Sequence, residues 1–395
     1  MGYIKLFSNA IAYQDYMNGD PLLPNVSLIE ENEGIFYTPK EVSSEYENEY
    51  LYLEALEDGM TVSFDKKATS GSLYYSLDKQ GWSEFTESQT INTGEKIYFK
   101  GDLVLASSGI GTFAINKQCN VAGNVMSLLF ADDFVGKTDL TGYNKVFRSL
   151  FNHCITIQSA ENLILPAITL SEGCYWQMFQ DCTGLTIAPE LPATTLAVAC
   201  YNSMFYNCTS LTTTPSILPA TTLSMFCYQA MFIRCTSLTS APELPATTLA
   251  NYCYGNMFFG CTGLTSAPEL PATTLADYCY QSMFNGCSSL TSTPKLPATT
   301  LANNCYQAMF QYCTSLTTAP ELPATTLAYN CYSNMFDGCT KLNNITMLAT
   351  DISASYCLSY WVANVASTGT FVKAEGVEIP TGSSGIPEGW SVQVA

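Results

Sequence analysis

Cysteines, a single histidine and one pair of adjacent carboxylates are the residues of this sequence that could carry out chemistry. Its 395 residues include 17 Cys, one histidine (His153) and the neighbouring Asp132 and Asp133. One imidazole cannot build a His-rich metal site, and only His153 could act as the base of a Ser-His or Cys-His pair. Neighbouring carboxylates on a strand point to opposite sides, so Asp132 and Asp133 make a poor acid–base pair. We therefore expect no catalytic residues.

The spacing of the cysteines indicates packing rather than metal binding or disulfides. From Cys174 to Cys339 they come in pairs eight residues apart, such as Cys253 and Cys261, and no CxxC spacing occurs. On a helix such a pair is separated by about 12 Å of rise, which is too far for a disulfide. A metal-binding row of cysteines is a much weaker alternative than buried free thiols that act as small hydrophobes. We expect no metal ion and no cofactor.

A repeat governs the organisation of the chain. The segment Cys-Tyr-x-x-Met-Phe-x-x-Cys recurs with its methionines at intervals of 26, 27, 26, 26, 26 and 26 residues. These methionines are Met178, Met204, Met231, Met257, Met283, Met309 and Met335. A fixed period of this size indicates a solenoid, in which each unit buries its apolar face against its neighbours. Units that match the repeat poorly lie at both ends, around Leu129 and around Trp361. Such atypical units are expected to cap the apolar ends of a solenoid.

Within one unit the apolar positions follow a helical spacing. Cys253, Met257 and Cys261 lie at i, i+4 and i+8, which predicts two to three turns of helix with one buried stripe. The following Leu-Thr-Ser-Ala reads as a short extended segment, and the two prolines after it keep the chain extended while removing hydrogen-bond donors. The predicted fold class is therefore an α/β repeat solenoid.

The repeated motifs resemble those of a known family. Leu-x-x-Ala-Pro-x-Leu-Pro and Met-Phe-x-x-Cys are similar to the BspA-type leucine-rich repeat, with its Ala-Phe-x-x-Cys-x-x-Leu-x-x-Ile-x-Ile-Pro pattern, over roughly residues 120–365. The longer repeat and the added Pro before Glu depart from the family and put the continuity of a parallel sheet in doubt. The resemblance implies a leucine-rich-repeat-like solenoid that is surface-exposed and serves adhesion or recognition rather than catalysis.

The sequence divides into four parts. Residues 46–118 hold five alternating, β-rich runs between Gly, Asp and Ser turns, which predict a small β-sandwich domain. The solenoid takes residues 119–365, and residues 366–395 are expected to form a hairpin that caps its last unit. Residues 1–45 have too few apolar side chains for a core of their own, so we expect an attachment segment that needs a partner surface or the β-domain.

The charge of the chain removes several classes of partner. A net charge of −19 repels phosphate backbones, so nucleic acid is not an expected partner. No stretch reaches the 18 or so apolar residues of a membrane span, and the N-terminal residues lack the apolar core of a signal peptide. We therefore expect no membrane insertion and a chain whose synthesis ends in the cytoplasm. Residues 1–118 hold 18 acidic and 8 basic groups and residues 119–365 hold 13 and 6, so more than half of the net charge precedes the solenoid.

Comparison of the repeats with one another gives a candidate ligand-binding ridge. Positions outside the constant framework carry Tyr and Phe mixed with Asn and Gln, which suit sugar stacking or protein contacts. The candidate residues are Tyr206, Phe226, Tyr252, Phe259, Tyr278, Tyr312 and Tyr329. Exposed positions also vary when nothing constrains them, and that alternative stays open. Charge is scarce on the ridge, which weighs against an ionic ligand.

An adhesion-type repeat protein without a signal peptide needs another route to the outside. We expect a phage virion component of the tail- or head-fibre type, attached to the particle through residues 1–45, because residues 46–118 look similar to the leading parts of such repeat proteins in gut bacteria and their phages. Its receptor would be a cell-surface glycan or protein, and a homo-oligomer, such as a trimer, is compatible with this role. The alternatives are a bacterial cell-surface adhesin, and a glycoside hydrolase or carbohydrate-binding accessory protein. A hydrolase requires two carboxyl groups within about 10 Å of each other in a pocket.

Overall fold

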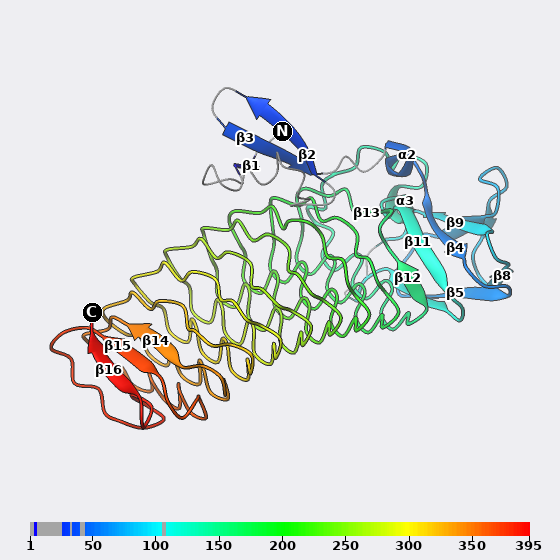
Figure 1. Cartoon of the computed structure of the whole chain (residues 1–395). Coiled ribbons are helices and arrows are strands. Elements are labelled where there is room, and N and C mark those ends of the chain that lie inside the picture. The colour runs from blue at the N-terminus through cyan, green and yellow to red at the C-terminus, as the bar shows by residue number, and fades with distance from the viewer. Residues whose placement is uncertain (1–3, 6–25, 32–33, 40–43, 105–107) are drawn as a thin grey trace.

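The protein is a row of similar chain turns with a strand-rich unit at one end and a small sheet at the other. The computed structural model describes residues 4–5, 26–31, 34–39, 44–104 and 108–395. Figure 1 shows the turns of chain from about residue 139 onward stacked side by side, and we call residues 139–365 the repeat stack.

The described part of the expected attachment segment is a small antiparallel sheet. Its strands β1 (Ile4–Lys5), β2 (Val26–Glu31) and β3 (Gly34–Pro39) have the order β1-β3-β2. The remainder of residues 1–45, apart from the start of a short helix at Ser44, lies outside the described residues.

Two further sheets pack face to face. The larger one has the order β12 (Ile157–Ser159), β11 (Cys119–Asn124), β4 (Leu51–Ala55), β9 (Lys96–Gly101), β6 (Leu73–Ser76) and β7 (Ser83–Glu84), with β13 (Leu163–Ile164) also paired to β11. The smaller one has the order β10 (Gly111–Ile115), β5 (Met60–Lys66) and β8 (Gln89–Ile91). Phe99 of β9 and Phe113 of β10 touch across the two sheets with ring centroids 4.9 Å apart.

Strand β11 joins the sandwich to the repeat stack. It pairs antiparallel with β4 and parallel with β12 and β13, so one strand makes the change from the antiparallel to the parallel arrangement. Phe113 also stacks on Phe151 of the first units, with ring centroids 5.5 Å apart. The two parts therefore share one continuous hydrophobic core.

The expected α/β class is wrong in its helical part, because the molecule is mostly β with little helix. In the described ranges the helices are α2 (Ser44–Glu47) and α3 (Ser127–Phe130), of four residues each. The segment of each repeat that the sequence predicts as a helix is a run of tight turns. An α-helix would direct every N–H to the carbonyl four residues earlier.

The run of turns divides its N–H groups between two destinations. The N–H of Met178 closes a turn on the Tyr175 carbonyl at 3.2 Å, three residues back. The next N–H, of Phe179, donates instead to the Met204 carbonyl of the following unit at 2.9 Å. This alternation continues along the run, so every second backbone group bonds one unit to the next.

Every fourth residue of the run has a left-handed backbone. In one unit these are Tyr252, Asn256 and Gly260, with φ of 58°, 57° and 70°. This conformation costs an L-residue roughly 1–2 kcal/mol, and Gly and Asn tolerate it best. The four-residue spacing of Cys, Met and Cys is the sequence signature of this backbone. Over only eight residues that spacing cannot be told from the 3.6-residue period of a helix, which is why the sequence misleads.

Identical side chains of successive units form columns through the core. The tyrosine column stacks its rings 5.5–6.1 Å apart and the phenylalanine column 5.3–5.8 Å apart. The tyrosines are Tyr175, Tyr201, Tyr228, Tyr254, Tyr280, Tyr306 and Tyr332, and all are buried. The in-register stacking follows from the backbone bonds, which place each residue against its equivalent in the next unit.

The cysteines are all free and buried, as the sequence predicts. The second cysteine of each pair also has a polar contact: Cys261 Sγ donates to the Phe232 carbonyl at 3.0 Å, and Cys287 Sγ to the Phe258 carbonyl at 3.1 Å. Cysteine therefore supplies both apolar volume and a weak donor to a buried carbonyl of the preceding unit.

The other sides of each unit are held by single parallel bridges. Thr248 bridges to Thr274, and Ser266 to Ser292, each residue facing its equivalent one unit on. Between Ile164 and Asn344 the bridges stay isolated and do not extend into strands. The repeated prolines explain this, since each removes a backbone donor.

The C-terminal end is a parallel sheet, so the expected capping hairpin is wrong. Strands β14 (Asn344–Met347), β15 (Thr370–Lys373) and β16 (Ser391–Val394) pair in that order, all parallel. Trp361 takes the methionine position and covers the ends of both aromatic columns, with its ring centroid 6.4 Å from Tyr332 and 6.1 Å from Phe336. Its Nε1 donates to the Gly385 carbonyl at 2.9 Å.

Substitutions at Ser282 distinguish the run of turns from a helix. Ser282 has φ of 52°, and its N–H donates to the Gln307 carbonyl of the next unit. We expect Ser282→Gly to raise the free energy of unfolding by up to about 1 kcal/mol, whereas in a helix it would lower it by about 0.5 kcal/mol. Ser282→Val should lower it by about 1–3 kcal/mol. Urea unfolding midpoints measure both, and a loss of stability in the glycine variant would contradict the left-handed conformation.

Candidate functional site

The seven aromatic residues predicted to bind a ligand all lie on the runs of turns, but in four different rows. A row here means one position repeated in successive units. Tyr329 occupies the first row, Phe226, Tyr252 and Tyr278 the next, Tyr206 and Phe259 a third, and Tyr312 a fourth. The sequence therefore places them on one side of the repeat stack without bringing them to one point.

Three of the seven stack on one another. Phe226 and Tyr252 have ring centroids 5.1 Å apart, and Tyr252 and Tyr278 lie 4.3 Å apart at an angle of 7°. At these separations no sugar ring fits between them, so the faces that meet are closed to a ligand. Only the ring edges and the two outermost faces of this stack remain for contact.

The exposed tyrosine rings gather near the C-terminal end of the repeat stack. Tyr312 and Tyr329, both expected, are 52% and 47% exposed, and Tyr356 and Tyr360, which the sequence reasoning missed, are 65% and 60% exposed. Tyr329 and Tyr356 meet edge to face with centroids 6.0 Å apart. We call these four residues the terminal tyrosines. The four-residue spacing of Tyr356 and Tyr360 could have identified these two residues. The last unit matches the repeat so poorly that the comparison of repeats did not include it.

A chain of amides leads to a carboxylate beside the terminal tyrosines. Asn285 Nδ2 donates to Gln311 Oε1 at 2.8 Å, and Gln311 Nε2 donates to Asp337 Oδ2 at 2.9 Å. Asn364 Nδ2 donates to the other oxygen, Asp337 Oδ1, at 3.0 Å. Gly338, next to this carboxylate, lies beneath the Tyr312 ring, since a Cβ there would clash with Tyr312 Cδ1. The polar group and the ring are thus held side by side.

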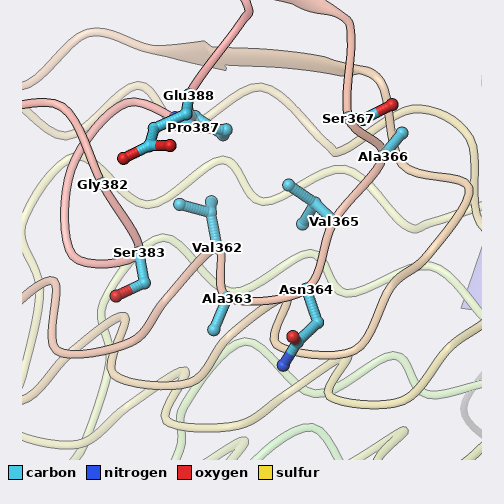
Figure 2. A pocket seen from close by; sticks show the side chains of 10 residues that line it. All are labelled: Val362, Ala363, Asn364, Val365, Ala366, Ser367, Gly382, Ser383, Pro387 and Glu388. Atoms are coloured by element: carbon cyan, nitrogen blue, oxygen red, sulfur yellow. The ribbon is translucent and has the colours of Figure 1, made fainter.

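A shallow hollow of about 200 Å³ lies in the last unit. Its walls are residues 362–367 together with Gly382, Ser383, Pro387 and Glu388. Figure 2 shows the side chains of Val362, Val365 and Pro387 around its centre, with Glu388 next to Pro387. Among the lining residues Glu388 is the one carboxylate, so the hollow lacks the carboxyl pair that a glycoside hydrolase uses.

The hollow adjoins the terminal tyrosines through backbone contacts. The Tyr360 N–H donates to Ser384 Oγ at 2.9 Å, and the Val362 N–H donates to the Ser383 carbonyl at 3.2 Å. Asn364 belongs both to the wall of the hollow and to the Asp337 hydrogen bonds. The hollow is therefore continuous with the backbone of Tyr360 and, through Asn364, with Asp337, beside which the Tyr312 ring lies.

The other candidates for chemistry have structural partners. Asp132 pairs with Lys100 at 2.7 Å and accepts the Tyr50 hydroxyl at 2.8 Å, and these two bonds lower the pKa of Asp132. Asp133 pairs instead with Lys137 at 2.9 Å. The exposed His153 lies 3.3 Å from an Asp181 oxygen. In the described part of the chain, no three His, Cys, Asp or Glu side chains are grouped to hold a metal ion.

The thiols are poor nucleophiles and poor metal ligands. Burial raises the pKa of Cys200, Cys253 and Cys261 to about 12, so they stay protonated at neutral pH. A thiolate is the reactive and metal-binding form of cysteine.

Across the described ranges, no helix is long and apolar enough to cross a membrane.

The similarity of the chain to known proteins is low. No protein-family model and no curated protein matches it. A crystal structure of a leucine-rich repeat protein from Bacteroides ovatus ATCC 8483 is similar at 18% sequence identity and a TM-score of 0.20, over 57% of this chain and 75% of that chain. A similarity this low assigns neither fold nor function, so the functional proposal rests on the geometry of this chain.

Alkaline pH is expected to unfold the protein steeply. An unfolded thiol ionises near pH 8.5, whereas the thiols of Cys200, Cys253 and Cys261 keep their protons to about pH 12. Stability from these protonated thiols is complete below pH 8.5 and is lost as the pH rises toward 12. Each such thiol lowers the free energy of unfolding by about 1.4 kcal/mol per pH unit in that window. Urea midpoints at pH 7, 9 and 10.5 measure the loss.

A thiol titration at pH 8 is the control. The native protein should react slowly with a thiol reagent, and all 17 cysteines should react after denaturation. Rapid reaction of the folded protein, or a midpoint unchanged up to pH 10.5, would contradict the role of burial.

Proposed function

We propose that this chain is a non-enzymatic recognition protein of the leucine-rich-repeat solenoid type, which binds a receptor on a bacterial surface. The observation that carries the proposal is the position of the terminal tyrosines. The aromatic columns of the repeat stack are buried, yet Tyr312, Tyr329, Tyr356 and Tyr360 are each about half exposed or more. Exposed aromatic rings that gather at one place are typical of interaction surfaces.

The architecture supports a binding role because it makes a rigid support. Alternate backbone groups bond each unit to the next, so the runs of turns form one continuous surface with side chains at fixed spacing. The amide chain that ends on Asp337 further restricts the side chains of Asn285, Gln311 and Asn364. Rigid tyrosines give a large contact area at a low entropy cost.

The biological setting that we favour is a phage virion, as a fibre-type component of the BspA-like kind whose receptor is a glycan or a protein. Residues 1–45 would attach the chain to the particle, and a homo-oligomer is compatible with this arrangement. A bacterial cell-surface adhesin uses the same binding surface and is the alternative. A glycoside hydrolase or carbohydrate-binding accessory protein is the second alternative, and the lining of the hollow holds one carboxylate, Glu388.

Binding to cells tests the recognition role. Fluorescently labelled full-length protein should bind intact cells of at least some gut bacteria, and Tyr356→Ala combined with Tyr360→Ala should reduce that binding at least tenfold. Both side chains are mostly exposed, so the thermal midpoint of the double variant should stay within a few degrees of the parent. Equal binding by parent and variant, or no binding to any strain of a broad panel, would contradict the proposal.

Deletion of residues 1–43 tests the attachment role. The shared core of the described residues begins at Leu51, and Glu47 of α2 accepts a bond from Asn124, so this deletion keeps both. We expect a folded protein with an unchanged thermal midpoint that no longer co-purifies with phage particles. Incorporation of the shortened chain at the level of the full chain would rule out attachment through this segment.

A further inference from the structure

We propose that the terminal tyrosines, Asp337 and the adjoining hollow form a binding site for neutral glycans. This inference rests on the proposed recognition function and names the ligand class and the site. The site consists of the rings of Tyr312, Tyr356 and Tyr360, the carboxylate of Asp337, and the hollow beside Glu388.

The rings supply the apolar half of the site. A pyranose ring presents C–H groups on its faces and hydroxyl groups around its rim, so it packs on an aromatic face and needs polar partners at its edge. Tyr356 and Tyr360 are the most exposed tyrosines of the chain's described part, at 65% and 60%. Tyr356 contacts Tyr329 edge to face with centroids 6.0 Å apart, whereas Tyr252 and Tyr278 lie 4.3 Å apart and close each other's inner faces.

Asp337 supplies the polar half. An ionised carboxylate has about four acceptor positions, and Gln311 and Asn364 use one on each oxygen. The remaining positions suit two sugar hydroxyls, which are donors. Because the two amides already hold the carboxylate in place, a ligand does not have to order it. The Tyr312 ring above Gly338 places an apolar surface next to these acceptors.

The local charge selects against acidic sugars. Residues 305–395 contain six Asp or Glu and two Lys, and Asp337 and Glu388 lie in the site itself. A sialic acid, uronic acid or sulfated sugar would bring a further negative charge to this surface without a basic partner among the residues of the site. The site therefore fits an uncharged glycan.

The hollow sets the mode of binding. Its volume of about 200 Å³ is below the range of roughly 300–1,000 Å³ for pockets that enclose a drug-sized ligand. Val362, Val365 and Pro387 give its lining apolar side chains, and Glu388 and Ser383 give it polar ones (Figure 2). It suits a terminal sugar or a single branch, while the rest of the glycan lies across the open tyrosines.

A glycan array with full-length protein tests the site. The probes are neutral oligosaccharides of hexoses, N-acetylhexosamines and fucose, printed beside sialylated and sulfated analogues of the same backbones. We expect binding to one group of neutral probes and at least tenfold weaker binding to their acidic analogues. Failure to bind any neutral probe, or stronger binding to the acidic analogues, would overturn the proposal.

Variants then assign the binding to these residues. Tyr356→Ala, Tyr360→Ala and Asp337→Ala should each weaken binding to the best neutral probe at least tenfold, whereas Tyr360→Phe keeps the ring and should stay within threefold. The matched control is Tyr252→Ala, which removes a tyrosine of the same repeat stack from outside the site and should leave the affinity unchanged. An equal loss in the control, or no loss in the three site variants, would overturn the assignment.

Cell binding separates this inference from the function on which it rests. If the protein binds bacterial cells but no neutral glycan, recognition stands and the glycan site is wrong, with a protein receptor as the remaining ligand. If the protein binds neither cells nor glycans, both proposals fail.

Discussion

The sharing of backbone hydrogen bonds between neighbouring units is the constraint on which the rest of this structure depends. In an α-helix the N–H groups are used within the segment itself, and neighbouring segments are held only by side chains. Here alternate N–H groups, such as that of Phe179, bond to the next unit, so the units are joined by main chain. The left-handed residue at every fourth position is what turns those groups outward, and it accounts for the Gly and Asn found at many of these positions.

The columns of identical side chains follow from the same bonds. Because the backbone places each residue against its equivalent in the next unit, each aromatic ring of a column stacks on the equivalent ring. In the same way the second cysteine of each pair lies near a carbonyl of the preceding unit, as Cys261 lies near that of Phe232. A column cannot continue past the last unit, and Trp361 closes two of them at once. The exposed tyrosines lie next to that closure, where the repeat no longer dictates which side chain each position carries.

The sequence was sufficient to predict the features that follow from the repeat period. It was not sufficient to predict the features that follow from the backbone conformation within a unit. The 26-residue spacing of the methionines predicted repetition and buried free thiols, because any arrangement with that period must pack like on like. It could not distinguish a helix from turns with a four-residue period over the eight residues between Cys253 and Cys261. The candidate ridge was predicted only from variation between the repeats. It therefore included both Tyr252, which stacks on its neighbours, and the exposed Tyr329, and it omitted Tyr356.

The number of repeat units can change during evolution while both ends of the repeat stack stay the same. The one longer interval, from Met204 to Met231, places its extra residue between Pro215 and Pro219, outside the run of turns. Gain or loss of a whole unit would keep every inter-unit bond in register and move the terminal tyrosines by one inter-strand spacing, about 4.8 Å. The number of units in the repeat stack thus sets the distance between the terminal tyrosines and the sandwich.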